Sequence, residues 1–225
     1  MSLKTHKVTI VSASLMEIKP LFLQYQPIKS NFHGLWIASE QLHFLITGMG
    51  MLNTATHLAI YTQKYTRDFY INAGICGAFN KTLKIGDVLQ ISSETYGDFG
   101  VESDDQFQDF FKMGFIDRVE DAFQYGQCVP IPSAFHLLIH LPKAISVTVN
   151  KVHSNPKSIQ QITEKYRADI ENMEGLAFYY VLKQVNQPGI EIRSVSNYVE
   201  KRNNENWDIQ KAVIQLNKAV QQLLS

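Results

Sequence analysis

The chain has 225 residues, of which 45% are hydrophobic and 19% are charged. A chain of this length buries about 70% of its unfolded surface, so we expect one α/β domain over residues 1–225 and no extensive disorder. The 21 basic residues balance the 21 acidic ones, and no segment concentrates either charge. This balance argues against nucleic acid and anionic membranes as partners.

The amino-terminal residues predict a cytoplasmic protein. The first apolar run, Val8 to Val11, is far shorter than a signal-peptide core or a membrane span. Cys76 and Cys128 lie far apart in the sequence without a CxxC motif. We therefore expect reduced thiols rather than a disulfide framework or a zinc site.

Short apolar runs alternate with stretches of helical periodicity, which is typical of a mixed β-sheet flanked by helices. Val8 to Val11 is the first predicted strand. Ser14 and Glu17 then have the spacing of a capping box, and a helix is expected to run toward Tyr25. The next expected elements are strands at about 35–39 and 42–47, a helix at 53–65, a buried strand at 69–72, a tight glycine turn at 74–78 and a strand at 88–92.

An irregular segment at about 97–127 is rich in aromatic residues, and we predict an ordered excursion that covers a binding site or joins two subunits. After it, Asn155 and Pro156 predict a helix start, because proline suits the first helical turn after an asparagine cap. The remaining expected elements are a helix near 133–140, a strand at 144–149, the capped helix ending near 166, a strand at 170–172, a helix ending at 184, a strand at 191–196 and a last helix from about 207.

Polar residues follow the predicted strands at four points, and ligands of open α/β sheets bind beyond the carboxyl ends of strands. The four groups are Ser14 to Glu17, Gly74 to Ala78, Met173 with Glu174, and Ser196 with Asn197. Each group also has a structural interpretation: a capping box, a glycine turn, a carboxylate at the positive end of a helix, and a polar turn. Taken one at a time, the groups leave the function open.

Together, the four groups resemble the nucleoside phosphorylase superfamily along nearly the whole chain. The segment Asn72 to Ala78 is similar to the family's Asn-Thr-Gly-Ser-Ala-Gly-Gly segment. Met173 to Gly175 resembles its Met-Glu signature, and Arg193 to Asn197 resembles its Arg-x-Ile-Ser-Asp strand end. The resemblance implies a homodimer or higher homo-oligomer that binds a purine nucleoside without a metal or organic cofactor.

Two departures resemble the futalosine hydrolases within that superfamily. Asn197 stands where methylthioadenosine and adenosylhomocysteine nucleosidases carry Asp. The stretch Ser196 to Arg202 with Trp207, and the stretch Asp98 to Glu102 with the phenylalanines that follow, are similar to futalosine hydrolases. This resemblance implies hydrolysis of futalosine to hypoxanthine and dehypoxanthine futalosine in menaquinone biosynthesis.

The resemblance also implies roles for single residues. Glu17 is expected to orient and deprotonate the attacking water, and Glu174 to hold the ribose hydroxyls. Asn197 is expected to donate a hydrogen bond to the leaving 6-oxopurine. Six further residues are expected to contact the substrate: Gly50, Ile75, Cys76, Gly77, Met173 and Ser196.

Hydrolysis is favoured over phosphorolysis by the residues before Gly74. Phosphorylases need cationic donors for the phosphate oxygens, and in this superfamily Arg commonly stands just before that segment. This chain has Asn72 and Ala73 there. Water is therefore the expected nucleophile.

Other interpretations stay open at this point. A methylthioadenosine or adenosylhomocysteine nucleosidase, or a non-catalytic nucleoside-binding protein, fits the same motifs. The glycines of Gly48 to Asn53, with Asp68, match a dinucleotide fingerprint poorly, because the third glycine is missing and the motif follows the third strand. His136 and His140 have helical spacing but lack the glutamate of a zinc-protease motif, so no metal site is predicted.

Overall fold

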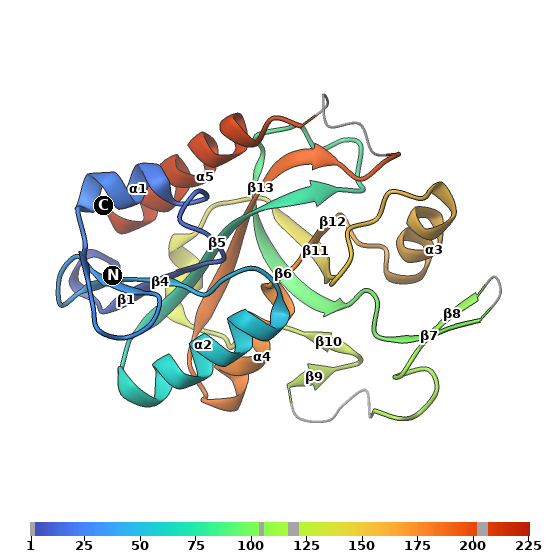
Figure 1. Ribbon diagram of the computed structural model, residues 1–225, viewed down its shortest axis with the longest axis horizontal. Helices are drawn as coiled ribbons and strands as arrows, with labels where there is room; N and C mark the ends of the chain where they lie inside the picture. Colours follow the sequence, from blue (N-terminus) through green and yellow to red (C-terminus); the bar gives the residue numbers. More distant parts are fainter. Residues whose placement is uncertain (1–2, 104–105, 117–121, 202–206) are drawn as a thin grey trace.

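The fold is a β-sheet between two groups of helices (Figure 1), and the computed structural model describes residues 3–103, 106–116, 122–201 and 207–225. The strands are β1 (Val8–Ser12), β2 (Ile28–Lys29), β3 (Leu35–Ile37), β4 (Leu42–Ile46), β5 (Phe69–Ala78), β6 (Val88–Tyr96), β7 (Gly100–Ser103), β8 (Gln106–Asp109), β9 (Phe123–Gln124), β10 (Gln127–Cys128), β11 (Lys143–Thr148), β12 (Ile170–Asn172) and β13 (Gly189–Tyr198). The helices are α1 (Lys19–Tyr25), α2 (Met51–Lys64), α3 (Pro156–Tyr166), α4 (Gly175–Gln184) and α5 (Ile209–Leu224), with 3-10 turns η1 (Leu3–Thr5) and η2 (Ala134–Leu138).

The sheet is mixed, as the sequence predicts. Within the described residues its order is β2-β3-β4-β1-β5-β12-β11-β6-β10-β9, and β13 pairs with both β5 and β6. β1 runs parallel to β4 and β5, and β13 runs parallel to β5. β6, β11 and β12 form a second parallel set, which meets the first through the antiparallel pairs β12–β5 and β13–β6.

The middle of β5 is where the two parallel sets meet. β1 pairs with β5 only as far as Asn72, whereas β5 continues to Ala78. Beyond Asn72, Glu171 of β12 lies opposite Gly77. The stretch from Gly74 to Gly77 is therefore approached by the carboxyl ends of strands from both sets, which is the kind of position where open α/β sheets bind ligands.

Apolar side chains cover both faces of the sheet. Tyr61 of α2 and Phe178 of α4 belong to one buried cluster, and Leu21 of α1 and Leu216 of α5 belong to a second. Figure 1 shows the same division, with α2 and α4 on one side of the sheet and α1 and α5 on the other. Burial of each large apolar side chain stabilises the fold by about 1.5–3 kcal/mol, so the two layers fix the strand ends that carry the polar residues.

Two glycines that were predicted to form a tight turn lie inside a strand instead. β5 is continuous from Phe69 to Ala78. A Cβ at Gly74 would collide with the side chain of Arg193, and a Cβ at Gly77 would lie 2.8 Å from Cγ2 of Val199. The prediction of a turn was wrong because these glycines make room for neighbouring side chains rather than for a change of chain direction.

Helix starts were predicted with mixed success. Asn155 caps α3 as predicted, with its side chain accepting from the backbone N–H of Lys157 at 2.9 Å. The spacing of Ser14 and Glu17 does not start α1, which begins at Lys19 without a side-chain cap. The helix expected near 133–140 is only the 3-10 turn η2, which Ser133 caps and which ends before Ile139.

The aromatic excursion is partly ordered strand. β7 and β8 form an antiparallel hairpin, and β9 and β10 form a second one at the edge of the main sheet. Residues 104–105 and 117–121 of the predicted excursion lie outside the described residues.

None of the helices in the described part of the chain is long and apolar enough to cross a membrane. The cytoplasmic location stays a prediction.

Candidate functional site

Glu17 is held by hydrogen bonds on both of its carboxylate oxygens. It lies between β1 and α1 and is 6% exposed. Oε2 accepts from the backbone N–H of Ser14 at 3.0 Å and from its hydroxyl at 2.9 Å, and Oε1 accepts from the backbone N–H of Ile75 at 3.1 Å. The bond to the Ser14 N–H is the one that a capping box predicts. The bond to Ile75 fixes the carboxylate over the middle of β5.

The surroundings of Glu17 raise its pKa above the ordinary value of 4.5. Burial is the largest cause, the positive charge of Arg193 opposes it, and the negative charge of Glu174 adds to it. A carboxylate with a raised pKa is a stronger base than an exposed one. Glu17 therefore has the properties of a group that removes a proton from water.

Glu174 is placed by the junction of β12 and α4. It is the N-cap residue of α4, and its Oε1 accepts from the backbone N–H of Gly50 at 2.9 Å. Gly50 precedes α2 with a φ of 90°, a conformation that favours glycine. Asn172 Oδ1 accepts the backbone N–H groups of Glu174 (2.9 Å) and Gly175 (2.7 Å). The Asn172 side chain thus satisfies the first backbone N–H groups of α4 in place of the Glu174 side chain, whose carboxylate is left to face the site.

A buried arginine for which no role was predicted lies between the two acids. Arg193 of β13 is 1% exposed, and its Nη1 lies 3.6 Å from Glu174 Oε2. Strand register places Arg193 beside Gly74, whose missing side chain gives the guanidinium its space. The signal in the sequence was the pair Glu191 and Arg193, two charged residues that share one face of an otherwise apolar strand.

A bulge at the end of β13 sets the direction of Asn197. The pairing of β13 with β5 shifts register between Val195 and Asn197. Asn197 Nδ2 donates to the carbonyl of Tyr198 at 3.1 Å, and the Ser196 hydroxyl lies 2.8 Å from Asn197 Oδ1 and 3.0 Å from the carbonyl of Cys76. Because a carbonyl oxygen only accepts, the side-chain amide of Asn197 turns its nitrogen, and not its oxygen, toward Tyr198. The second N–H of that nitrogen is then left for a ligand.

Asn197 lines a cavity of about 90 Å³ beside β5, together with Gly77 and Trp207. Glu171 lies in the same wall, and both of its oxygens are held by His153, through the backbone N–H at 3.0 Å and Nδ1 at 2.7 Å. The cavity therefore combines an amide donor, a fixed carboxylate–imidazole pair and an indole ring. Such a mixture suits a flat aromatic ligand with a polar edge.

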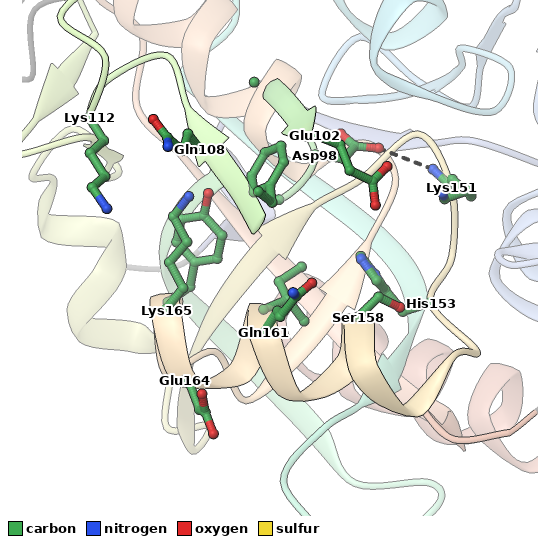
Figure 2. A pocket seen from close by; sticks show the side chains of 15 residues that line it. Asp98, Glu102, Gln108, Lys112, Lys151, His153, Ser158, Gln161, Glu164 and Lys165 are labelled. Carbon is green, nitrogen blue, oxygen red and sulfur yellow. Dashed lines mark hydrogen bonds between the residues drawn. The ribbon is translucent and has the colours of Figure 1, made fainter. Parts of the chain in front are cut away.

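A larger cavity of about 780 Å³ lies between the β7–β8 hairpin and α3 (Figure 2). Its lining mixes charged and polar residues, such as Glu102 and Gln108 from the hairpin and Lys165 from α3, with the apolar side chains of Phe107 and Ile162. His153 lines both cavities, and none of the predicted site residues lines the larger one. The smaller cavity is therefore the candidate site, because Gly77 and Asn197 line it.

The structure brings most of the predicted site residues together. Hydrogen bonds and the buried cation join Glu17, Ile75, Glu174 and Gly50, and the half-buried Met173 directly precedes Glu174. Asn197 and Gly77 line the small cavity, and Ser196 is hydrogen-bonded to Asn197. Cys76 differs: its thiol packs in the core, where burial raises its pKa, and its backbone carbonyl lies next to Ser196. The catalytic and binding roles of these residues stay predictions.

The two weaker motifs are used for structure. In the segment from Gly48 to Asn53, Gly50 is the N-cap residue of α2, and its backbone N–H donates to Oε1 of Glu174. His136 Nδ1 forms a capping box with Ser133, and its Nε2 lies 3.3 Å from the carbonyl of Gly189. The described residues contain no group of three His, Cys, Asp or Glu side chains that could hold a metal ion.

Comparison with known proteins identifies the family. Residues 23–225 match the Phosphorylase superfamily. The chain belongs to this superfamily. It is 26% identical over 186 residues to the futalosine hydrolase of Thermus thermophilus, covering 81% of this chain and 80% of that protein. It is 28% identical over 213 residues to the 5'-methylthioadenosine/S-adenosylhomocysteine nucleosidase of Maridesulfovibrio salexigens, covering 86% of each.

Among solved structures, this phosphorylase superfamily member shares its fold with the 5'-methylthioadenosine/S-adenosylhomocysteine nucleosidase of Neisseria meningitidis. The TM-score is 0.79 at 17% identity, over 96% of this chain and 97% of that one. The family resemblance and the fold predicted from the sequence are thus confirmed. Relatives of both enzyme types match at similar identity, so the comparisons do not choose the substrate.

Proposed function

We propose that this superfamily member is an N-glycosyl hydrolase that cleaves the N-ribosyl bond of a purine nucleoside. Its best substrate is futalosine, which yields hypoxanthine and dehypoxanthine futalosine in menaquinone biosynthesis. The observation that carries the proposal is the linked arrangement of Glu17, Arg193 and Glu174 at the middle of β5, the strand whose Gly77 lines a cavity together with Asn197. The hydrolases and nucleosidases among the relatives support the reaction class.

The acids act on water and ribose. Cleavage of the bond passes through an oxocarbenium-like state, so the site must stabilise a cationic sugar and position a water. Glu17 takes the proton of that water, and Glu174 accepts hydrogen bonds from the ribose hydroxyls. Arg193 favours the ionised form of Glu17 despite its burial. The two carboxylates then place negative charge next to the developing cation.

Asn197 acts on the leaving base. One N–H of the Asn197 amide is donated to the carbonyl of Tyr198, and the other can be donated to an acceptor on the base. A 6-oxopurine presents acceptors at ring nitrogen 7 and at its oxygen, and hypoxanthine leaving as an anion spreads its charge over both. An amide donor suits this edge without needing a protonated carboxyl group. This match supports futalosine as the substrate.

The second candidate is a methylthioadenosine or adenosylhomocysteine nucleosidase. It is favoured by the 28% identity to the Maridesulfovibrio nucleosidase over 86% of both chains. A 6-aminopurine presents an acceptor at ring nitrogen 7 and a donor at its amine, so it needs a partner that both donates and accepts. The orientation of the Asn197 amide supports the 6-oxopurine instead.

The deciding experiment is chromatographic detection of the free base after incubation with futalosine, its 6-amino analogue, methylthioadenosine and inosine, each with and without phosphate. We expect hypoxanthine from futalosine at a rate that phosphate does not change. Glu17→Gln serves as the inactive control. Adenine release from methylthioadenosine with futalosine left intact would assign the second candidate. Absence of release from all four would refute hydrolysis and leave a nucleoside-binding protein.

We also propose that the active form is a homo-oligomer. Leu52 on α2 is 81% exposed and Met49 just before it is 66% exposed, so two large apolar side chains close in sequence face solvent, and contact with a second subunit would bury them. Light scattering after size exclusion measures the mass directly. We expect more than one subunit, with Leu52→Lys shifting the mass toward the monomer.

A further inference from the structure

Two buried carboxyl groups meet beneath the candidate site. Glu94 of β6 and Glu191 of β13 are both 0% exposed. A Cβ at Gly175, the first residue of α4, would collide with both oxygens of Glu191 and with Oε1 of Glu94. The two side chains therefore crowd the same point from two strands.

The hydrogen bonds of the pair leave one oxygen without a donor. Glu94 Oε2 accepts from the Thr148 hydroxyl at 2.7 Å, and Glu94 Oε1 accepts from Asn172 Nδ2 at 2.6 Å. Glu191 Oε1 accepts from Arg193 Nε at 2.6 Å. Glu191 Oε2 is buried and has no hydrogen-bond partner among the described residues. A buried charged oxygen without a donor is strongly unfavourable, and a proton on the neighbouring acid would supply the donor.

We propose that Glu94 is protonated and donates a hydrogen bond to Glu191, so that the acid pair holds Arg193 in its position between Glu17 and Glu174. The shared proton satisfies Glu191 Oε2 and removes one of two adjacent buried charges. Glu191 keeps its negative charge because it is bonded to the guanidinium. Both acids are positioning residues, which act through Arg193 and not on the substrate. The kinetic part of this inference rests on the proposed function, whereas the shared proton rests on the geometry of the pair.

The charges around the pair favour the same assignment. Burial raises the pKa of Glu94 well above 4.5, and the negative charge of Glu191 raises it further. At Glu191 burial also raises the pKa, but Arg193 opposes it by charge and by hydrogen bond. The titratable groups that face the pair from the surrounding elements are Arg193, Glu174, Tyr179, Cys76 and Cys128. Burial raises the pKa of the tyrosine and of both thiols, so these three stay neutral and do not compete with Arg193.

The shared proton is tested by infrared spectroscopy of the whole protein at pH 7. A protonated carboxylic acid has a carbonyl band that carboxylates lack. We expect this band in the unmodified protein and in Glu40→Gln, a control at an exposed acid, and its loss in Glu94→Gln. Identical spectra for the unmodified protein and Glu94→Gln in the carbonyl region would overturn the shared proton.

The positioning role is tested by kinetics on futalosine. Gln at position 94 keeps an N–H for Glu191 and an oxygen for Thr148, but it loses the oxygen that accepts from Asn172. Because the hydrogen bond to Glu191 is kept, Glu94→Gln should keep kcat within about threefold. Glu191→Gln removes the charge that holds Arg193 and should lower kcat at least about tenfold, with a smaller change in KM. Unchanged kcat in a folded Glu191→Gln would overturn the positioning role. If Glu191→Gln does not fold, Glu94→Gln and the infrared band still decide the inference. Failure of every variant and of the unmodified protein to release a base would instead count against the proposed function, and the infrared comparison would still stand.

Discussion

The guanidinium of Arg193 occupies the space that a side chain at Gly74 would need. The two residues are neighbours in the register of β13 and β5, so the strand pairing itself sets the position of the cation. From there the positive charge of Arg193 favours the ionised form of Glu17, and Nη1 of Arg193 lies 3.6 Å from Oε2 of Glu174. The missing Cβ is thus a condition for the linked arrangement of the two acids.

Gly74→Ala should displace the guanidinium and weaken the site. Overpacking of a buried position typically costs about 1–3 kcal/mol in unfolding free energy. We expect a folded variant in which kcat falls at least about tenfold, because loss of one preorganised charge costs more than about 1.4 kcal/mol of transition-state stabilisation. Steady-state kinetics and urea unfolding measure the two effects separately. Normal kcat would show that Arg193 does not need the space above Gly74.

Glu17→Gln should abolish most of the turnover. Removal of a general base typically lowers kcat by about 10²- to 10⁴-fold. The variant also turns an amide N–H toward a backbone N–H, whichever way it flips, because Ser14 and Ile75 both donate to Glu17. Fluorescence titration with the product base serves as the control for an intact cavity. A loss of less than about tenfold would assign the water to another base.

Glu17 should also make the fold less stable at neutral pH. Its folded pKa is raised above the ordinary 4.5, so the neutral form fits the fold better than the charged form. The contribution of Glu17 is therefore most favourable below pH 4.5 and is lost as the pH rises through the raised value. The unfolding free energy of Glu17→Gln minus that of the unmodified protein should therefore increase as the pH rises from 4 to 7. Glu40 is the matched control, because its hydrogen bond and ion pair with Lys7 lower its pKa and give the opposite sign. Equal pH dependence for both variants would contradict the assignment.

The sequence predicted the order of the main strands and most helices, because apolar strand runs and helical periodicity are local signals; the roles of the two candidate acids stay predictions. It did not predict the path of β5, since Gly74 and Gly77 look like turn residues until Arg193 and Val199 are placed against them. Glu17 combines a contact that the sequence predicts with one that it does not. Its bond to Ser14 is encoded by a three-residue spacing, whereas its bond to Ile75 depends on the pairing of β1 with β5.

A single residue near the end of the chain holds the backbone of Glu17. Asn217 of α5 donates to the carbonyl of Glu17 at 2.7 Å and accepts from the N–H of Leu21 at 3.0 Å. Asn217→Leu leaves both backbone groups unpaired in a buried place, which should cost about 1–3 kcal/mol for each group. We expect a lower thermal midpoint and a lower kcat at temperatures where the variant is folded. Gln210→Leu, on the exposed side of the same helix, is the matched control and should leave kcat unchanged. A destabilised Asn217→Leu with full kcat would show that Asn217 stabilises the fold but is not needed to position Glu17.

Asn197→Asp tests how the leaving base is chosen. Asn197 Nδ2 now faces the carbonyl of Tyr198, so an ionised carboxylate in its place would set a negative oxygen against another acceptor. The variant should therefore work only while the introduced carboxyl group is protonated, and the optimum for futalosine should move to lower pH. A protonated carboxyl both donates and accepts, so cleavage of the 6-amino analogue should rise relative to futalosine. Competition between the two nucleosides, followed by chromatography of both bases, measures the ratio directly. Ser196→Ala is the matched control, because it removes the hydroxyl next to Oδ1 without changing the charge at position 197. If Asn197→Asp lowers the release of both bases equally at every pH, the amide orients the nucleoside but does not select the base.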